Sequence, residues 1–331
     1  MSSYSIKSSN SSRYNDNNLA SFWKKGWEEN RPLRFTVIFS AVLFVATLFG
    51  MFVDSRTVIG EPVWLKPTKF AISSVFYAAS LMWVLAMLKD RARLVSIVSW
   101  VTAIAMIGEL VLIVIQAFRG VRSHFNMSTA LDGAIFSIMG IMILSLWIVS
   151  IVALVALFRQ KFENRAWGAI LKWALLITVV GSGLGGTMTS PRSSQLEAAQ
   201  KTGSLPESGA HTIGAPDGGE GLPGVGWSTE GGDLRIGHFL GLHALQIVPI
   251  LGLAILWLAR GRSENQQTNL IHVASLGYLG TIALITWQAF RGEPLIYPSS
   301  LTLTTAGAFL LLLTLAAGLI LTTSRPSPAL T

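Results

Sequence analysis

Two histidines lie five residues apart in the apolar segment Gly237-His238-Phe239-Leu240-Gly241-Leu242-His243. Neutral imidazole is a common protein ligand for haem iron and also binds copper or zinc, and the neighbouring glycines leave room for a flat ligand. A helix turns by about 500° over five residues, so the two rings point about 140° apart and cannot hold one iron from both faces. We therefore expect His238 or His243 to bind a metal or a haem together with a partner from elsewhere in the chain. The alternative is that each is a hydrogen-bonded interfacial group.

Glu109 lies inside another long apolar segment. An ionisable side chain is costly to place in hydrocarbon and is a functional candidate by default. On a helix, Gln116 points within about 20° of Glu109, and Arg119 follows at the end of the segment. This arrangement suits proton movement or the binding of a cation, and it makes Glu109 and the nearby His124 candidate general bases. An interhelical hydrogen bond from Glu109 is the structural alternative.

Several arginines gather at the ends of apolar segments: Arg119, Arg122, Arg235 and Arg291. Guanidinium groups bind carboxylates and phosphates through paired hydrogen bonds. We expect these arginines to ring a polar pocket and to bind haem propionates, another cofactor anion or a lipid headgroup, whereas the acidic residues of segment 189–234 are the alternative partner. Further candidates for ligand binding are Lys69, Tyr77, Gln116, Asn126, Asp132, Trp227, Gln246 and Gln288.

The composition predicts that a membrane protein positions these side chains. Of the 331 residues, 51% are hydrophobic and 13% are charged, against about 25% charged in soluble domains. Apolar runs of this length span about 30 Å of hydrocarbon as helices, and they lack the alternation of a barrel strand. We predict an all-α integral membrane protein with eight transmembrane helices, at Phe35–Val53, Phe70–Leu88, Leu94–Phe118, Ala134–Phe158, Ala166–Met188, Ile236–Leu258, Leu270–Phe290 and Leu301–Thr322.

The composition also excludes several classes of protein. A soluble globular enzyme does not fit so few charges, and the absence of Cys excludes disulfides, thiolate-bound zinc, iron–sulfur clusters and thiol catalysis. The net charge of +8 is not accompanied by a basic and aromatic surface motif, so no nucleic-acid partner is expected.

The distribution of Lys and Arg predicts the orientation in the bilayer. With the N-terminus in the cytoplasm, 16 of the 25 basic residues lie on the cytoplasmic side, as the positive-inside rule requires. We expect a plasma (bacterial inner) membrane location, with cytoplasmic tails at 1–32 (disordered) and 324–331 and an extracytoplasmic loop at 189–234. Within this loop, we expect Gly221–Asp233, which contains Trp227, to form a lid and Lys201–Gly219 to be mobile.

An internal repeat predicts how the helices are grouped. Gln116-Ala117-Phe118-Arg119-Gly120 recurs 172 residues later as Gln288-Ala289-Phe290-Arg291-Gly292, each time at the end of an apolar segment. Lys69-Phe70 then aligns with His238-Phe239. We predict two tandem, parallel-oriented four-helix bundles, residues 33–165 and 166–323, related by an axis along the membrane normal. The alternative is that an arginine simply marks the helix end in both places.

This layout resembles the haem A synthase family. The stretch Gly181-Ser-Gly-Leu-Gly-Gly-Thr-Met-Thr-Ser-Pro-Arg192 is similar to the glycine-rich exit from the first helix of a unit in that family, and Arg235-Ile-Gly-His238 stands where the family has its sixth-helix haem ligand. The family also places histidines in helices 2, 4 and 8, whereas this chain has Lys69 at the start of helix 2, Lys66 in place of an acidic residue, and no histidine in helices 4 and 8. The resemblance therefore implies a haem or another planar cofactor near His238, and not haem A synthesis.

Three functions remain open at this point. The first is a haem-binding or redox membrane protein that uses His238 or His243. The second is a transporter or binding protein for a small anionic or amphiphilic solute, with Lys69, Arg119 and Arg291 at the entrance. The third is a membrane enzyme that acts on a lipid-borne group, with His124 or Glu109 as general base.

Overall fold

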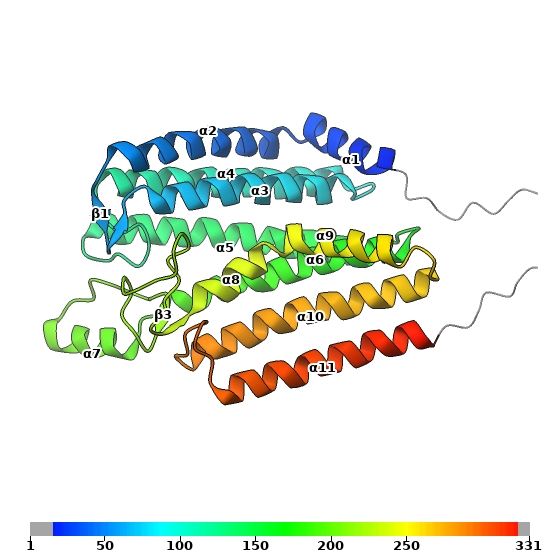
Figure 1. The fold of residues 1–331 in the computed structure, drawn as a ribbon. Coiled ribbons are helices and arrows are strands. Elements are labelled where there is room, and N and C mark those ends of the chain that lie inside the picture. Colours follow the sequence, from blue (N-terminus) through cyan, green and yellow to red (C-terminus); the bar gives the residue numbers. More distant parts are fainter. Residues whose placement is uncertain (1–15, 324–331) are drawn as a thin grey trace, which may run out of the picture.

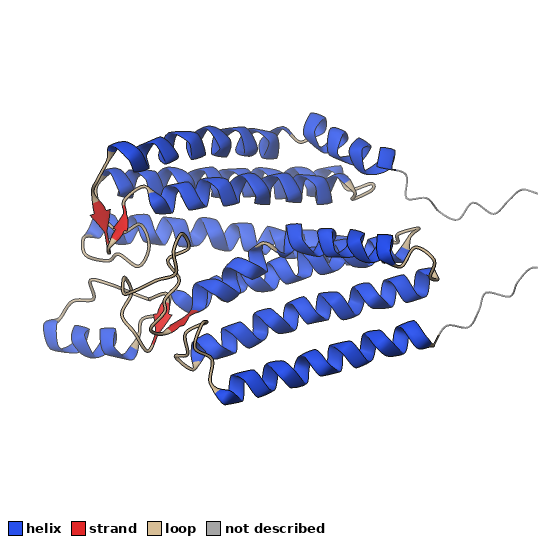
Figure 2. Ribbon diagram, in the orientation of Figure 1, coloured by secondary structure: helices blue, strands red, loops and turns tan. Residues whose placement is uncertain are grey.

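The computed structural model describes residues 16–323, which form long helices lying side by side and two short hairpins (Figures 1 and 2). The helices are α1 (Asp16–Glu29), α2 (Arg31–Val53), α3 (Leu65–Ala86), α4 (Ala92–Phe118), α5 (Ala130–Arg159), α6 (Arg165–Leu184), the 3-10 turn η1 (Gly185–Met188), α7 (Ser193–Thr202), α8 (Leu234–Leu242), α9 (Ala244–Leu258), α10 (Glu264–Phe290) and α11 (Ser300–Thr322). The antiparallel hairpins pair β1 (Thr57–Val58) with β2 (Glu61–Pro62), and β3 (Thr212–Ile213) with β4 (Gly232–Asp233).

The prediction of membrane-spanning helices is confirmed. Within residues 16–323, seven helices are long and apolar enough to cross a membrane: α2, α3, α4, α5, α6, α10 and α11. Helices α8 and α9 pass the same test together but are bent by 58° at their junction, so the number of spans is seven, or eight if the bent pair is one span. Each of the eight predicted segments coincides with one of these elements.

Local sequence explains where several of these helices begin. The side chains of Asn30, Thr129 and Ser299 each accept a hydrogen bond from a backbone N–H in the first turn of α2, α5 and α11, respectively. Such caps satisfy N–H groups that have no partner within the helix. The residues that connect the spans therefore also fix the level at which each helix starts.

The two halves of the chain use the same helix pairings. In the first half, α3 packs on α2, α4 packs on both, and α5 packs on α4; in the second, the α8–α9 pair packs on α6, α10 packs on both, and α11 packs on α10. The halves meet where α5 packs on α6 and α3 packs on α9. Close approach of α6 and α8 is possible because Gly181 and Gly241 face each other, and a Cβ on Gly181 would lie 2.3 Å from the Cα of Gly241.

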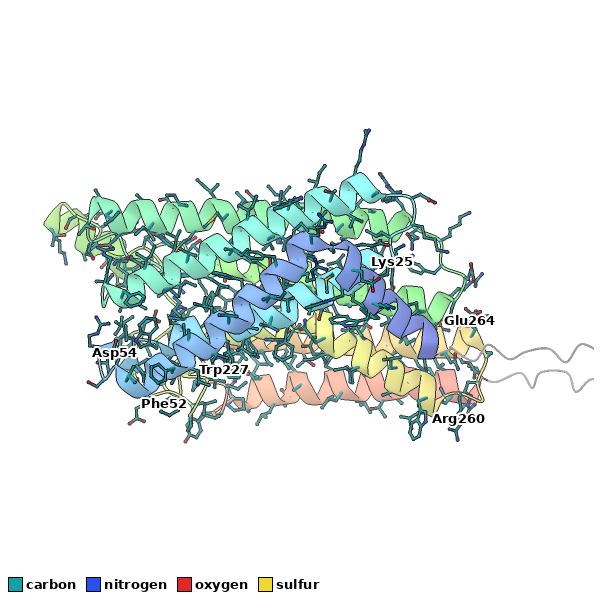
Figure 3. The ribbon with its side chains drawn as sticks, turned by 90° about the horizontal axis from the view of Figure 1, so that it is seen from above. Lys25, Phe52, Asp54, Trp227, Arg260 and Glu264 are labelled. Atoms are coloured by element: carbon teal, nitrogen blue, oxygen red, sulfur yellow. The ribbon has the colours of Figure 1, made fainter. Side chains whose placement is uncertain are left out.

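The exposed side chains are those expected of a protein in lipid. Val42 and Phe52 of α2, Ile141 of α5 and Leu312 of α11 are large, apolar and more than 60% exposed. Figure 3 shows Phe52 near one end of α2, beside the polar Asp54. Because a soluble protein would bury such residues, this surface fits contact with hydrocarbon.

Two segments that are predicted to lack structure are partly ordered. Residues 16–29 of the predicted tail form α1, which packs on α3 where Gly26 lies against Met82. The long loop forms α7 and the β3–β4 hairpin, and β3 lies inside the part, 201–219, for which mobility is predicted. We call residues 189–233 the cap and the end of the bundle at which they lie the loop end; α1 begins and α11 finishes at the opposite, termini end (Figure 1). Residues 1–15 and the predicted tail 324–331 lie outside the described residues.

Candidate functional site

A triad of Lys66, His124 and Glu109 lies at the loop end of the first half. Lys66 is in the first turn of α3, Glu109 is on the buried face of α4, and His124 is in the segment that connects α4 to α5. The Lys66 Nζ lies 3.0 Å from His124 Nδ1, and His124 Nε2 lies 3.2 Å from Glu109 Oε1. The two predicted bases, Glu109 and His124, are thus in direct contact.

The surroundings of His124 keep its imidazole neutral. Its ring lies among Phe70, Phe125 and Phe136, with centroid distances of 5.8, 6.1 and 6.3 Å. Burial, and next the positive charge of Lys66, lower the pKa of His124 to about 4. A neutral imidazole that accepts from the Lys66 ammonium at Nδ1 donates from Nε2 to Glu109, so the hydrogen-bond partners assign the tautomer.

The backbone beside His124 is strained and is held by the cap. Phe125 has a φ of +63°, a left-handed conformation that is rare for a bulky residue. Its carbonyl accepts a hydrogen bond from the Ser208 N–H at 3.0 Å, and the Met127 N–H donates to the Pro206 carbonyl at 2.9 Å. The cap thereby fixes the segment that carries His124.

A second histidine of the cap lies next to this segment. The rings of His211 and Phe125 are 4.9 Å apart, and His211 Nδ1 lies 3.0 Å from Asp217 Oδ2. Burial lowers the pKa of His211. Neither His211 nor Lys66 is predicted from the sequence to be a site residue, yet both belong to the site. A lysine in the first turn of an apolar helix is the signal for Lys66, since such a charge is costly without a partner.

The four arginines that are predicted to bind a cofactor each pair with a carboxylate of this chain. Arg122 pairs with Glu207 of the cap, and Arg235 bonds to Asp233, with Nη2 and Oδ2 2.6 Å apart. Arg291 lies 2.7 Å from Glu293. Arg119 lies 2.5 Å from Asp132, which also accepts from the Gln116 amide and the Thr129 hydroxyl. The alternative partners, the acidic residues of segment 189–234, are observed for Arg122 and Arg235, whereas Arg119 and Arg291 pair with carboxylates outside that segment.

The second half of the cap contacts α3 and α8 near their starts, and its role as a lid stays a prediction. Lys69 Nζ lies 3.8 Å from Glu61 and donates to the Val225 carbonyl at 3.3 Å. The Trp227 ring meets Phe239 of α8 edge to face at 5.7 Å.

The first half of the cap is also joined to the bundle. Asn126 pairs in antiparallel fashion with Glu207 through the backbone. Lys69, Trp227 and Asn126 therefore bind the cap to the bundle.

The two histidines of α8 and α9 do not converge on one point. His238 Nδ1 lies 2.7 Å from the Gly181 carbonyl, whereas His243, at the α8–α9 bend, bonds to Gln246 at 3.2 Å. Gln246 donates across the interface between the halves to Ser80.

Two other predicted ligand-binding residues also have partners away from the triad. The Tyr77 hydroxyl lies 3.3 Å from the Ser150 hydroxyl, and Gln288 donates to the Pro294 carbonyl. Among the described residues, no three His, Cys, Asp or Glu side chains lie close enough to hold a metal ion.

Comparisons with known proteins give no family for this chain. No family model, no curated protein and no solved structure matches it. The resemblance to the haem A synthase family stays a prediction.

Proposed function

We propose that the protein is a membrane enzyme that transfers a proton to or from a membrane-borne substrate beneath the cap. The observation that carries the proposal is the unbroken contact from Lys66 through His124 to Glu109. A neutral imidazole with one partner on each nitrogen can take a proton on one side and release one on the other.

The triad can work as follows. Lys66 passes a proton to His124 Nδ1, and His124 Nε2 passes one to the Glu109 carboxylate. The imidazole stays neutral, Glu109 becomes a neutral acid, and the Lys66 amine is free to accept a proton from the substrate. The substrate anion then faces the Lys66 ammonium, which stabilises it. Lys66 is the catalytic base in this scheme, and His124 and Glu109 are its proton acceptors.

Two features favour an amphiphilic substrate. Three phenylalanine rings surround the imidazole, and the neighbouring helices present apolar faces to the surroundings. The arginines that a free anionic solute would need are already paired with carboxylates, which favours an enzyme over an anion transporter. The distribution of basic residues supports an orientation with the loop end outside a plasma membrane, as the positive-inside rule predicts.

Deuterium exchange tests the proposal and does not require the substrate to be identified first. Purified protein is incubated in D₂O with a total lipid extract of the expression host, and the lipids are analysed by mass spectrometry. We expect wild type to introduce deuterium into one class of lipid and Lys66→Met and His124→Gln to lose at least 90% of this activity. His272→Gln is the matched control, because His272 bonds to Trp173 on another part of the bundle. No exchange by wild type, or equal exchange by all variants, refutes the proposal.

A haem at His238 is the second candidate, and one observation favours it. The contact of Nδ1 with the Gly181 carbonyl leaves Nε2 as the ligand atom, an orientation that is common for histidines that bind iron. The arginines fit a haem less well, since their guanidinium groups are engaged with carboxylates. A reduced-minus-oxidised absorption spectrum after expression with added haem decides this, and His238→Ala should abolish any Soret band.

We also propose that the two halves arose by duplication of a four-helix unit. Support comes from the equivalent helix pairings in the two halves and from the repeated Gln-Ala-Phe-Arg-Gly sequence at the ends of α4 and α10. Superposition of α2–α5 on α6–α11 tests this, and unrelated helix positions would refute it.

A further inference from the structure

Glu109 has one carboxylate oxygen that faces neither His124 nor Lys66. The side chain is 6% exposed, and Oε2 has no hydrogen-bond partner among the described residues. A buried carboxylate oxygen without a partner is costly. Such orphaned atoms are the usual partners of buried water.

Two buried hydroxyls in the same three-helix region share this property. Ser40 of α2 and Thr102 of α4 are fully buried, and neither hydroxyl has a partner within residues 16–323. Helices α2, α3 and α4 pack on one another, so the buried faces of α2 and α4 belong to one core. Thr36 and Thr47, on the same face of α2, instead donate to carbonyls of their own helix.

The register of the helices places these groups in sequence along the bundle. The Asn30 amide donates to the Ser99 hydroxyl at 2.7 Å, which sets Asn30, the residue that caps α2, level with Ser99 of α4. Both helices run from the termini end to the loop end (Figure 1). Ser40 lies ten residues after Asn30, and Glu109 lies ten residues after Ser99. At 1.5 Å per residue, both are about 15 Å closer to the loop end than that pair. Ser40 and the Glu109 backbone are therefore at the same depth.

Thr102 lies between Glu109 and the termini end. Thr102 precedes Glu109 by seven positions, so the two side chains point in directions that differ by only about 20°. Thr102 is also about 10 Å closer to the termini end. Ser99 follows one turn further toward the termini end and is 1% exposed. Ala105 and Met106 are the buried side chains between Thr102 and Glu109 on this face, and the thioether chain of Met106 is flexible.

We propose that water and the side chains of Ser40, Thr102, Ser99 and Asn30 form a proton path between Glu109 and the termini end. The proposal rests on the proposed function, because the proton that the triad delivers to Glu109 must leave again. Hydroxyls both donate and accept, so they can pass protons between water molecules. The path joins the triad at the unpartnered Glu109 Oε2. When no water molecule lies beside Met106, its side chain interrupts the path between Thr102 and Glu109.

Proton flux into liposomes tests the path. The full-length protein is reconstituted into vesicles that contain a pH-sensitive dye, and a potassium gradient with valinomycin imposes a membrane potential of either polarity. With the interior negative we expect the lumen to acidify faster than in protein-free vesicles, and with the interior positive we expect it to become alkaline faster. Glu109→Gln and Thr102→Val should each reduce the protein-dependent rate at least tenfold, and Met106→Ser should raise it.

Thr36→Val and Thr47→Val are matched controls, since each removes a hydroxyl that already has a partner. Both should retain the wild-type rate. Ser40→Ala serves as a second loss-of-path variant, because it removes a single oxygen from a site where it forms no hydrogen bond and should preserve folding.

The outcomes separate the two proposals. A wild-type rate equal to that of protein-free vesicles, or a normal rate in Thr102→Val and Ser40→Ala, overturns the path, and deuterium exchange by wild type would then leave the proposed function intact. Flux that these variants abolish, in a protein that exchanges no deuterium into lipid, supports the path and overturns the function.

Discussion

The ends of α4 and α10 have the same sequence and the same turn, but they lead to different surroundings. Gly120 and Gly292 have φ values of +67° and +73°, and both follow an arginine. Gln116 and Gln288 each donate to the carbonyl six residues later, at 3.3 and 2.8 Å. The repeated sequence therefore specifies one way of ending a helix.

The two regions differ in the titratable side chains that lie near this turn. At the offset of 172 residues, Thr281 and Ile296 occupy the positions of Glu109 and His124. The Thr281 hydroxyl donates to a carbonyl of its own helix, and Ile296 cannot titrate. The two halves thus have equivalent helix pairings, and within residues 16–323 only the first carries the triad.

The largest expected effect comes from removing the cation of the triad. Lys66→Met leaves the buried Glu109 without its nearest positive charge, which should destabilise the protein by about 4 kcal/mol. Unfolding in mixed detergent micelles measures this. The double variant Lys66→Met/Glu109→Gln should recover most of the loss; if it does not, packing and not charge explains the effect.

The two repeated arginines should differ in importance. Arg119→Ala removes a partner of Asp132, whose side chain is 4% exposed, and should destabilise by about 2 kcal/mol. Arg291→Ala opens a more exposed pair and should destabilise by less than about 1 kcal/mol. Equal losses in the same unfolding assay would contradict the distinction between the halves.

Acid should destabilise the first half through His124. Its pKa is about 4 in the folded protein, below the ordinary value of 6.5, so the unfolded chain binds more protons between these values. Stability is therefore greatest above pH 6.5 and falls by up to about 1.4 kcal/mol per pH unit as the pH drops toward 4. Unfolding of wild type and His124→Gln at pH 7.0, 6.0 and 5.0 checks this, and the variant should show a flatter profile. The neighbouring Lys66, Glu109 and His211 remain in both proteins.

The smallest effect should be the same in both halves. Gly120→Ala and Gly292→Ala place a Cβ in the left-handed region and should each destabilise by about 1 kcal/mol. The nearest non-local atom would lie 3.6 Å from the new Cβ at either position, so neither change adds a clash. Unfolding in the same micelles measures both variants, and a difference of more than about 0.5 kcal/mol between them would show that the turns are not equivalent.

The sequence predicts the spans because hydrocarbon imposes both length and composition on a helix. It does not predict the bend between α8 and α9. The only proline in this region is Pro249, six residues past the bend, and the bent backbone is accompanied by contacts from Gln246 to Ser80 and the Phe76 carbonyl. Contacts between distant helices of this kind leave no local pattern.

The same limit applies to the site. Residue type alone is enough to select Glu109 and His124, and pairs such as Asp233 with Arg235 are two residues apart, so they are visible in the chain itself. The contact between Lys66 and His124 could not be predicted from the sequence, because it depends on the register of α3 relative to α4. Arg122 and Glu207 are likewise joined only by the fold of the cap.

The left-handed backbone of Phe125 has a consequence for access to the triad. A strained residue of this kind stores about 1–3 kcal/mol, and it persists only while its surroundings hold it. The holding contact is the Ser208 N–H of the cap. If the proposed substrate enters by displacing the cap, release of this strain at Phe125 would offset part of the energy of opening. On this proposal, Phe125→Gly should make the closed form more persistent, because glycine adopts the left-handed conformation without strain.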